Sequence, residues 1–466
     1  MRRDIVHPGA DRLKYEIREI VSFARELSRW NIPILWENIG DPVKKGEPIA
    51  PWIKDIVRDK VADDLSYAYS ETEGARDTRV FLAGLAAARG AAPQGLTPNV
   101  SGTMQGQTPT VSGTAALDPC QPIGPEDILF FNGLGDAVAK VFGFLRREAR
   151  VLGPSPAYST LSSAEAAHSG YDHLTYRLDP DKDWMPDMAD VELKVKYNDS
   201  IAGILLINPD NPTGAVYPAS VLKEFVRIAR TYGLFIIADE TYANIVYGGA
   251  STAALSQVIG QVPGIALRSI SKEVPWPGAR CGWAEIYNRK ADPRFEAYVR
   301  SLLDAKRLEV CATSLPQLCI PPIMGDSRYP SHLARRAAIF EARAEEAANA
   351  FKGLDNIRVN KPRGALYATA LFDEKVFSDG ASLRRSLPIR DSSLAAFIHE
   401  RTIQVAPDKR FVYWLLAATG ICVVPLSGFA SDLPGFRFTL LEHDDETRRS
   451  IYATLAEASA AYIASA

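Results

Sequence analysis

The sequence has few of the residues that build disulfide frameworks or metal sites. Its 466 residues include only five cysteines and six histidines. The cysteine count is odd, no two cysteines form a CxxC pair, and the histidines show neither an HExxH motif nor another paired spacing. These absences argue against a disulfide scaffold and against a metal centre. They favour a reducing, cytoplasmic location.

Long apolar runs and a strong excess of charge are also lacking. The longest apolar run, Tyr413–Leu426, is too short for a membrane span and contains Gly and Pro, so we expect it in a core. The charged N-terminal stretch has no apolar segment typical of a secretory signal. A net charge of -3 and a pI of about 6.2 give no reason to expect nucleic acid or a membrane as a partner.

What is present is an ordinary globular composition with one clear supersecondary unit. Hydrophobic residues make up 47% of the chain and charged residues 23%, and the length suggests two or three domains. Residues 201–207 and 234–238 are continuous apolar runs that predict buried strands. Between them, residues 218–233 have helical periodicity, with Pro at the start and Gly at the end. This βαβ pattern predicts a parallel sheet and an α/β fold.

Further strands are predicted on both sides of this unit, at 127–131, 264–270 and 281–287. A long helical stretch at 331–351 then leads into a smaller α/β or α+β region. We therefore expect a large domain with a mostly parallel central sheet in 61–330 and a small C-terminal domain in 331–466. Residues 1–60 are expected to form an N-terminal arm and part of the small domain.

Two segments stand apart from this pattern. Residues 89–124 are rich in Gly, Thr, Pro, Gln and Ser and have almost no large apolar side chains, so they cannot form a core. We interpret them as an insertion that is either a plain surface loop or a lid near the active site. The acidic run Glu442–Glu446 is interpreted as a solvated face.

Polar residues follow the predicted strands at the points where they end. Asn211, Asp239 with Tyr242, and Lys272 each come after an apolar run, and a GxG turn at 133–135 follows another. Ligands of open parallel sheets bind beyond the carboxyl ends of the strands. We therefore expect these side chains to converge on one site.

The motifs at these strand ends carry a resemblance. NPDNPTG at 208–214, DETYANIVY at 239–247, SISKEVPWPGARCGW at 269–283 and GFRF at 435–438 stand in a characteristic order and spacing. The chain resembles the pyridoxal-phosphate-dependent class I/II aminotransferases, which have the aspartate aminotransferase fold (fold type I). The resemblance extends from about Glu37 to the end of the chain, except for the insertion.

The resemblance implies roles for the residues around the cofactor ring. Lys272 would form the Schiff base with pyridoxal 5'-phosphate and then move a proton to and from the substrate α-carbon. Asp239 would keep the pyridinium nitrogen protonated. Tyr242 and Asn211 would hydrogen-bond the phenolic oxygen, and Tyr158 would stack on the ring.

The phosphate and the substrate carboxylate would be bound by other matching positions. Backbone amides of Leu134 and Gly135 open a predicted helix and suit an anion, and Ser269 and Arg280 would complete the phosphate cradle. Tyr69 would reach the phosphate of the neighbouring subunit, although the SETEG sequence after it departs from the family and Tyr67 is a rival.

On the substrate side, Arg437 would bind the α-carboxylate, and Gly40 would line the pocket where a side chain would collide with the substrate. Lys306 and Arg307 lie in the region where a second cation would serve a dicarboxylate, but neither aligns. Trp276, between Lys272 and Arg280, has no role that the sequence explains.

The sequence thus predicts a homodimeric aminotransferase that transfers the amino group of an L-α-amino acid to a 2-oxo acid such as 2-oxoglutarate. No metal and no macromolecular partner beyond a second copy are expected. Two alternatives stay open. One is another α-carbon chemistry of the same fold, namely β-elimination, decarboxylation or oxidation; the other is a non-enzymatic pyridoxal-phosphate sensor.

Overall fold

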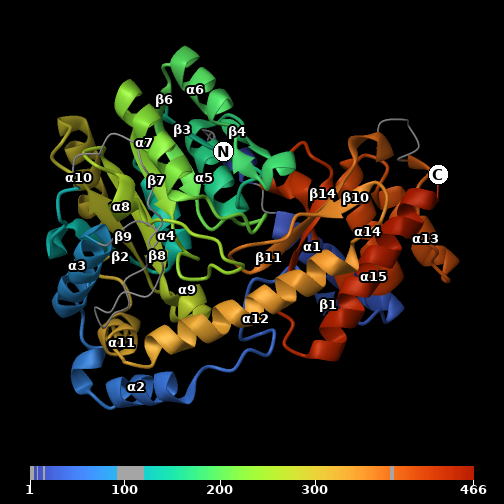
Figure 1. The fold of residues 1–466 in the computed structure, drawn as a ribbon, viewed down its shortest axis with the longest axis horizontal. Helices are drawn as coiled ribbons and strands as arrows, with labels where there is room; N and C mark the ends of the chain where they lie inside the picture. The colour runs from blue at the N-terminus through green and yellow to red at the C-terminus, as the bar shows by residue number, and fades with distance from the viewer. Residues whose placement is uncertain (1–4, 8, 14–15, 92–119, 378–382, 466) are drawn as a thin grey trace.

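The computed structural model describes residues 5–7, 9–13, 16–91, 120–377 and 383–465. Within them the chain forms a large and a smaller sheet, each covered by helices (Figure 1). The long helix α12 (Tyr329–Ala350) runs from the part that contains the large sheet to the part that contains the smaller one. This helix matches the helical stretch expected from the sequence.

The large sheet has eight strands in the spatial order β2-β9-β8-β7-β6-β3-β4-β5. They are β2 (Ile128–Phe131), β3 (Arg150–Ser155), β4 (Thr175–Asp179), β5 (Met185–Pro186), β6 (Ile201–Ile207), β7 (Phe235–Asp239), β8 (Gly264–Ser269) and β9 (Gly282–Tyr287). Pairing is parallel from β8 through β4. Strand β9 is antiparallel to β8 and β2, and β5 is antiparallel to β4. The expected α/β fold with a mostly parallel sheet is confirmed.

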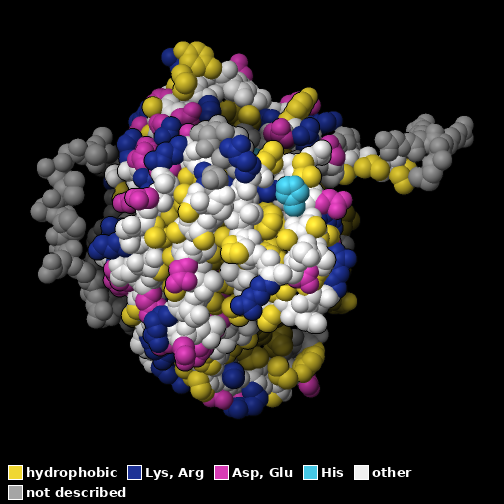
Figure 2. All heavy atoms as spheres, turned by 90° about the vertical axis from the view of Figure 1, so that its right-hand side faces the viewer, with side chains coloured by type: hydrophobic (Ala, Val, Ile, Leu, Met, Phe, Trp, Pro, Cys, Tyr) yellow, Lys and Arg dark blue, Asp and Glu magenta, His cyan; other side chains and the backbone are white. Residues whose placement is uncertain are grey.

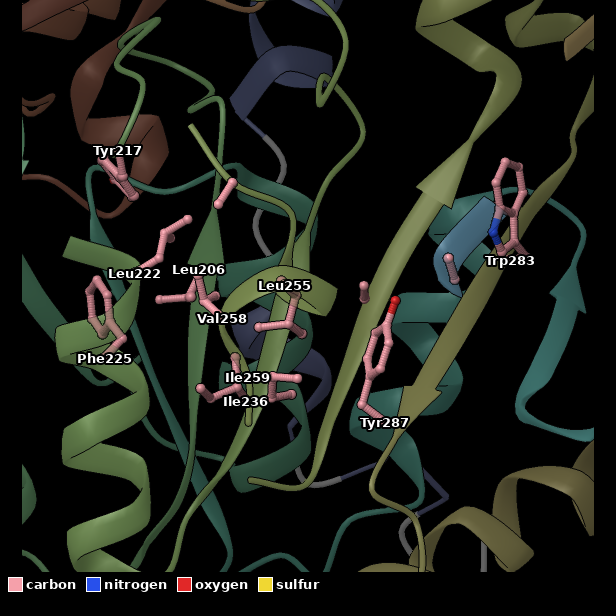
Figure 3. Close-up of a cluster of buried hydrophobic side chains, with 14 of the residues drawn as sticks. Leu206, Tyr217, Leu222, Phe225, Ile236, Leu255, Val258, Ile259, Trp283 and Tyr287 are labelled. Atoms are coloured by element: carbon pink, nitrogen blue, oxygen red, sulfur yellow. The ribbon is translucent and has the colours of Figure 1, made fainter. Parts of the chain in front are cut away.

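Both faces of the large sheet are buried. In β6, Leu206 packs into one hydrophobic cluster, whereas Leu205 and Ile207 pack into a second one. Figure 3 shows Leu206 in the first cluster, near Phe225 of helix α7 (Ala219–Tyr232). Because side chains alternate between faces and neither face meets water, β6 is apolar at every position.

Ten helices of the described residues accompany this sheet, and α7 follows the predicted pattern. It begins after Pro218 and ends at Gly233, whose φ of 68° few other residues adopt easily. The others are α2 (Pro51–Val61), α3 (Arg76–Ala91), α4 (Leu134–Gly143), α5 (Ser159–Ser169), α6 (Met188–Tyr197), α8 (Leu255–Val258), α9 (Ile270–Glu273), α10 (Pro293–Arg307) and α11 (Ser314–Met324).

The smaller sheet is antiparallel, in the order β10-β11-β14-β13. Its strands are β10 (Ile357–Val359), β11 (Tyr367–Phe372), β13 (Val424–Pro425) and β14 (Gly435–Thr439), and its helices are α13 (Ser392–Arg401), α14 (Pro407–Thr419) and α15 (Asp445–Ala464). The run Tyr413–Leu426 is largely buried here, as expected.

The N-terminal segment lies against these C-terminal elements (Figure 1). Strand β1 (Leu35–Trp36) pairs in parallel with β12 (Ile421–Cys422). Helix α1 (Glu16–Glu26) packs its apolar side into the same hydrophobic cluster as β11 and β14. Both ends of the chain therefore contribute to one core.

The expectation that the insertion begins at Arg89 is wrong. Residues 89–91 complete helix α3, and the Arg89 guanidinium pairs with the fully buried Glu285 carboxylate of β9 at 2.6 Å. A buried carboxylate requires such a partner, so Arg89 belongs to the folded core. Residues 92–119, the bulk of the insertion, lie outside the described residues.

The acidic run Glu442–Glu446 is also more than a solvated face. Lys45 Nζ lies 2.5 Å from Glu37 Oε1 and 2.8 Å from Glu442 Oε2. Asp444 accepts a hydrogen bond from the Thr447 amide at the start of α15. The run therefore ties the segment around Lys45 to the C-terminal part and caps a helix.

All five cysteines are free. Within the described ranges, no helix has the length and apolarity needed to cross a bilayer, and no group of three or more His, Cys, Asp or Glu side chains is arranged to bind a metal. On the face drawn in Figure 2, basic and acidic side chains are interspersed.

Candidate active site

A cavity of about 640 Å³ lies at the carboxyl ends of the parallel strands, next to β11, β14 and the N-terminal segment. The structure brings together every predicted site residue except Tyr69. Those that line the cavity are Gly40, Leu134, Gly135, Tyr158, Asn211, Asp239, Tyr242, Ser269, Lys272, Arg280 and Arg437. A larger depression beside it, of about 1350 Å³, shares Trp36, Ile39 and Lys44 with the cavity but holds none of these residues.

Asp239 is the last residue of β7, and its carboxyl group points to the cavity. Its Oδ1 accepts hydrogen bonds from Thr241 N at 3.0 Å and Thr241 Oγ1 at 2.5 Å. Burial raises the pKa of Asp239 above its usual value, although these hydrogen bonds and the charge of Lys272 act against that rise. A cation placed beside this carboxyl would favour its ionised form.

Lys272 lies in α9, the single helical turn that follows β8. Its Nζ donates a hydrogen bond to the Gly40 carbonyl oxygen. Two sets of hydrogen bonds hold this turn in place. Arg336 Nη1 donates to the Lys272 carbonyl at 2.6 Å. The buried Glu273 carboxylate accepts from Asn244 and from Tyr329. The amine is thus presented to the cavity from a rigid support.

One end of the cavity is built to receive an anion. Leu134 and Gly135 begin helix α4, after Gly133 with a φ of 83°. A Cβ at Gly133 would overlap the Arg280 guanidinium, whereas a Cβ at Gly135 would meet no atom within 4 Å. The helix N-terminus, the open space at Gly135 and Arg280 therefore converge. Ser269 lies beside them as the N-cap of α9.

Arg437 lies in β14, lines the cavity and is 1% exposed. Its Nη2 donates to the Asn38 carbonyl at 2.6 Å and its Nη1 to Asn211 Oδ1 at 3.3 Å. Its guanidinium also stacks on the Tyr367 ring, with the carbon 4.4 Å from the ring centroid. These contacts fix the planar fork that binds carboxylates well.

Two predicted aromatic residues have different positions. Tyr158 is the N-cap of α5, lines the cavity and packs against the hydrophobic cluster of β6 and α4. Tyr69 is 83% exposed and lies outside the cavity of its own chain, and its rival Tyr67 is 72% exposed. The Tyr67 hydroxyl donates to the Val61 carbonyl.

Lys306, Arg307 and Trp276, for which the sequence suggested no role, do not line the cavity. Lys306 is fully buried, pairs with Glu309 at 2.7 Å and faces the Phe131 ring, so it is part of the core. Arg307 is exposed and pairs with Asp304. Neither lines the cavity. Trp276 packs against the main hydrophobic cluster.

Sequence reasoning missed two residues that complete the site. The Tyr367 hydroxyl lies 3.0 Å from that of Tyr242, and a Cβ at Gly40 would overlap it. Asn38 is 1% exposed and lines the cavity, yet its side-chain amide has no partner in the described chain. The only available signal was local: Asn38 stands two residues before Gly40, and Tyr367 follows a Gly-containing turn.

The arrangement fits pyridoxal phosphate in its separate parts. The α4 N-terminus and Arg280 suit a phosphate, and the buried carboxyl of Asp239 suits a protonated ring nitrogen. Lys272 provides the primary amine that this cofactor requires, and Tyr158 provides an aromatic wall.

Comparisons with known proteins identify relatives of this chain. The chain is 48% identical over 457 residues to an uncharacterized aminotransferase of Methanocaldococcus jannaschii, covering 98% of both chains. It is 30% identical over 254 residues to the glutamate-pyruvate aminotransferase AlaA of Escherichia coli, covering 54% of this chain and 62% of that protein.

Solved structures show the same fold. An Escherichia coli aminotransferase superposes with a TM-score of 0.77 at 22% identity, covering 100% of this chain and 99% of that one. The alanine aminotransferase of Pyrococcus furiosus gives 0.76 at 22% identity, covering 99% of both.

The family model that matches the sequence describes class I and II aminotransferases and covers residues 113–455. These residues include β2 to β14 and most of the cavity wall. Members of this family are generally pyridoxal-phosphate enzymes, which the cavity's donor set fits. With fold, site and sequence in agreement, the chain belongs to the class I and II aminotransferases and is a transaminase.

Proposed function

We propose that this enzyme transfers the amino group of an L-α-amino acid to a 2-oxo acid such as 2-oxoglutarate, using pyridoxal 5'-phosphate. The observation that carries the proposal is the convergence of Lys272, Asp239 and Arg437 on one cavity. Lys272, Asp239 and Tyr242 are the proposed catalytic residues. The other cofactor-binding residues are Asn211, Tyr158, Leu134, Gly135, Ser269 and Arg280, with Tyr69 supplied by a partner subunit.

The residues divide the work of cofactor binding, substrate binding and proton transfer. Bound pyridoxal phosphate supplies an electron sink for the bonds at the substrate α-carbon. Arg437 and Asn211 bind the α-carboxylate and orient the substrate. Lys272 Nζ would then move the proton of the substrate α-carbon to the cofactor. The Gly40 carbonyl accepts a hydrogen bond from that amine when the amine is not bonded to the cofactor.

The names of relatives support a choice of substrates to test first. Two of them are a glutamate-pyruvate aminotransferase and a mitochondrial alanine aminotransferase of Saccharomyces cerevisiae. We propose two substrate pairs to test first, each an amino acid with its corresponding 2-oxo acid: glutamate with 2-oxoglutarate, and alanine with pyruvate. A spectral screen of all amino acids against the holoenzyme tests this choice without assuming it.

Lys272→Ala tests the assignment of the amine. We expect the purified variant to lose the visible absorbance of lysine-bound cofactor and to lose transamination. The matched control is Lys54→Ala, which removes an exposed lysine of α2 that does not line the cavity. If Lys272→Ala keeps both the absorbance and the activity, the assignment is wrong.

The reaction type is tested by product analysis. Adding an amino acid alone to the holoenzyme should convert the cofactor stoichiometrically to its amino form and release the 2-oxo acid. Release of ammonia or CO₂ in repeated turnovers would instead favour elimination, oxidation or decarboxylation. Absence of any turnover with every amino acid would favour the pyridoxal-phosphate sensor.

We further propose a cytoplasmic homodimer with shared active sites. Tyr69 is 83% exposed, and Val61, Leu65 and Tyr67 nearby are exposed as well, which supports a partner covering this region. Mixing inactive Lys272→Ala with inactive Tyr69→Ala chains tests the sharing. A hybrid dimer has one intact composite site, so activity should reappear; continued inactivity of a verified hybrid would reject the sharing.

The division of the chain into domains also remains a proposal. The pairing of β1 with β12, and the packing of α1 beside β11 and β14, support assigning part of 1–60 to the small domain 331–466. The large domain would then be 61–330. Limited proteolysis of the holoenzyme, with mass analysis of the fragments, tests these boundaries.

A further inference from the structure

Residues 37–47 form a loop that lies between two of the proposed functional side chains. The Gly40 carbonyl oxygen accepts a hydrogen bond from Lys272 Nζ, and the Asn38 carbonyl oxygen accepts one from Arg437 Nη2 at 2.6 Å. The proposed catalytic lysine and the proposed carboxylate-binding arginine thus contact acceptors in the same loop. A displacement of the 37–47 loop relative to either side chain would change the site.

Ion pairs fix the 37–47 loop to the C-terminal part of the chain. Lys45 Nζ lies 2.5 Å from Glu37 Oε1 and 2.8 Å from Glu442 Oε2. Thr439 Oγ1 of β14 donates to Glu37 Oε2 at 2.6 Å. Glu37 is fully buried, and charged groups shielded from water interact more strongly than exposed ones. The loop is therefore tied to β14 and to the start of α15, and its link to the lysine depends on other contacts.

Arg336 of α12 joins the end of this loop to the backbone of the lysine, and Figure 1 shows α9 beside α12. Arg336 is 3% exposed. Its Nε donates to Glu47 Oε1 at 2.5 Å and its Nη2 to Glu47 Oε2 at 3.1 Å, so the ion pair is bidentate. Its Nη1 donates to the carbonyl oxygens of Lys272 at 2.6 Å and of Glu273 at 3.3 Å. One planar guanidinium therefore connects two segments that are far apart in the sequence.

The contacts of Lys272 close into a circuit. Its amine is bonded to Gly40 of the 37–47 loop, and its backbone carbonyl is bonded through Arg336 to Glu47 of the same loop. In the proposed reaction Nζ changes its bonding, whereas the contacts of Arg336 involve no reacting atom. The pair of Arg336 and Glu47 is therefore the link that keeps the lysine backbone and the loop in a fixed relation while the amine is engaged elsewhere.

Glu47 is the carboxylate that balances the charge of Arg336. The neighbouring Glu273 carboxylate is directed elsewhere, since it accepts from the Tyr329 hydroxyl at 3.2 Å. His332 Nε2 donates to the Glu273 carbonyl oxygen at 3.1 Å, and burial, aided by the charge of Arg336, lowers the pKa of this histidine and favours its neutral ring. Loss of the Glu47 carboxylate would thus leave a buried guanidinium without its charge partner.

We propose that Arg336 and Glu47 are positioning residues for the catalytic lysine, which hold its backbone in place relative to the 37–47 loop. The proposal rests on the function proposed above, in which Lys272 moves a proton of the substrate. Neither Arg336 nor Glu47 lines the cavity, so both act through Lys272. Proton transfer requires precise placement of the amine. The pair should therefore govern the rate of the chemical step and not the binding of the substrate carboxylate.

Arg336→Lys and Glu47→Gln test this role in the holoenzyme. An ammonium group keeps the charge of Arg336 but lacks its planar fork, and an amide has one acceptor oxygen for the two donors that Glu47 receives. We expect kcat for transamination to fall about tenfold in both variants, since small displacements in an active site are costly. KM for the amino acid should stay within about twofold of the parent value, because Arg437 keeps its contacts.

The pH midpoint of the holoenzyme's visible absorbance gives a second measurement that does not depend on turnover. The positive charge of Lys272 and the carboxylate of Asp239 attract each other. A lysine displaced from Asp239 loses part of that attraction, so its protonated form becomes less stable. We expect the midpoint of Arg336→Lys to fall by about half a pH unit. Because this variant retains the positive charge at position 336, the change reports the position of the amine.

Arg335→Gln is the matched control, because it removes the neighbouring arginine of α12, which is exposed and does not line the cavity. It should leave kcat, KM and the pH midpoint at their parent values. If Arg336→Lys does not fold, Glu47→Gln decides by its kcat and KM, since its side chain is partly exposed.

Parental kcat and pH midpoint in the folded variants would overturn the proposal, even if their thermal unfolding midpoints fell, because the pair would then serve stability alone. A rise in KM at unchanged kcat would overturn it as well. None of these results would touch the proposed transamination, which fails only if the parent holoenzyme turns over no amino acid.

Discussion

The hydroxyl oxygens of Tyr242 and Tyr367 lie 3.0 Å apart inside the cavity, and their rings meet edge to face at 5.8 Å. Tyr242 comes from the segment after β7 and Tyr367 from β11 of the smaller sheet. The Tyr367 ring also supports the Arg437 guanidinium. One residue therefore connects the proposed cofactor contact with the proposed substrate contact.

Tyr367→Phe should change the cofactor's environment while leaving the ring in place. In its proposed role Tyr242 donates to the phenolic oxygen of the cofactor, which leaves Tyr367 to donate to Tyr242. Hydrogen bonds in such chains strengthen one another. We expect the variant to show a higher pH midpoint in the titration of the holoenzyme's visible absorbance and a kcat about tenfold lower. Tyr367→Leu should in addition raise KM, because Arg437 loses its support. An unchanged pH midpoint in Tyr367→Phe would contradict this role.

Gly40→Ala should disturb the same pair of residues. A Cβ at this position would overlap the Tyr367 hydroxyl, and the Gly40 carbonyl accepts from Lys272. We expect a folded enzyme with kcat/KM reduced by about tenfold or more, since small displacements in an active site are costly.

The double variant Gly40→Ala with Tyr367→Phe provides the control for that prediction. Removing the hydroxyl relieves the overlap, so the two losses should be less than additive in a double-mutant cycle of kcat/KM. Fully additive losses would mean that the two residues act independently. Gly40 would then affect the substrate directly, as its sequence position suggested.

The sequence predicted the parts of the site that follow from strand order. Asn211, Asp239 and Lys272 were recognisable because the carboxyl ends of parallel strands meet at one edge, and because their motifs resemble a known family. Tyr367 and Asn38 were not, since their roles depend on contacts between segments far apart in the chain. No local periodicity encodes that β11 faces Tyr242, or that the segment after β1 lies under Arg437.

The same distinction explains why the sequence did not reveal the pairings of Arg89 and Glu442. Arg89 stands in a Gly- and Ala-rich stretch that looked like the start of a loop, but its partner Glu285 lies 196 residues away. Glu442 looked solvated until the chain placed Lys45 beside it. Isolated charges in a sequence carry no mark of the partner that will bury them.

Arg437→Lys should separate carboxylate binding from cofactor binding. Lysine keeps the charge but loses the fork that bonds Asn38 and Asn211 and that receives a carboxylate with two parallel hydrogen bonds. We expect KM for amino acids to rise about a hundredfold. The holoenzyme's absorbance and the thermal unfolding midpoint should stay close to those of the parent enzyme. Loss of the absorbance with an unchanged KM would assign Arg437 to the cofactor instead.

Glu285 should account for part of the enzyme's loss of stability in acid. Burial alone raises the pKa of its carboxyl, but the charges of Arg89 and Arg268 and the hydroxyl of Tyr287 outweigh burial and lower the pKa to about 2. A carboxyl with a depressed pKa stabilises the fold above its unfolded pKa of about 4.3, and this contribution is lost as the pH falls towards 2. The contribution is on the order of 3 kcal/mol at neutral pH.

Glu285→Gln should therefore lower the stability of the fold at pH 7. It should also make the loss of stability between pH 4.5 and 2 less steep, as measured by thermal unfolding across that range. Glu446→Gln, at an exposed position, is the matched control and should reproduce the parent curve. If Glu285→Gln declines as steeply as the parent enzyme, the acid sensitivity arises from other carboxyl groups, and the pairing with Arg89 does not govern it.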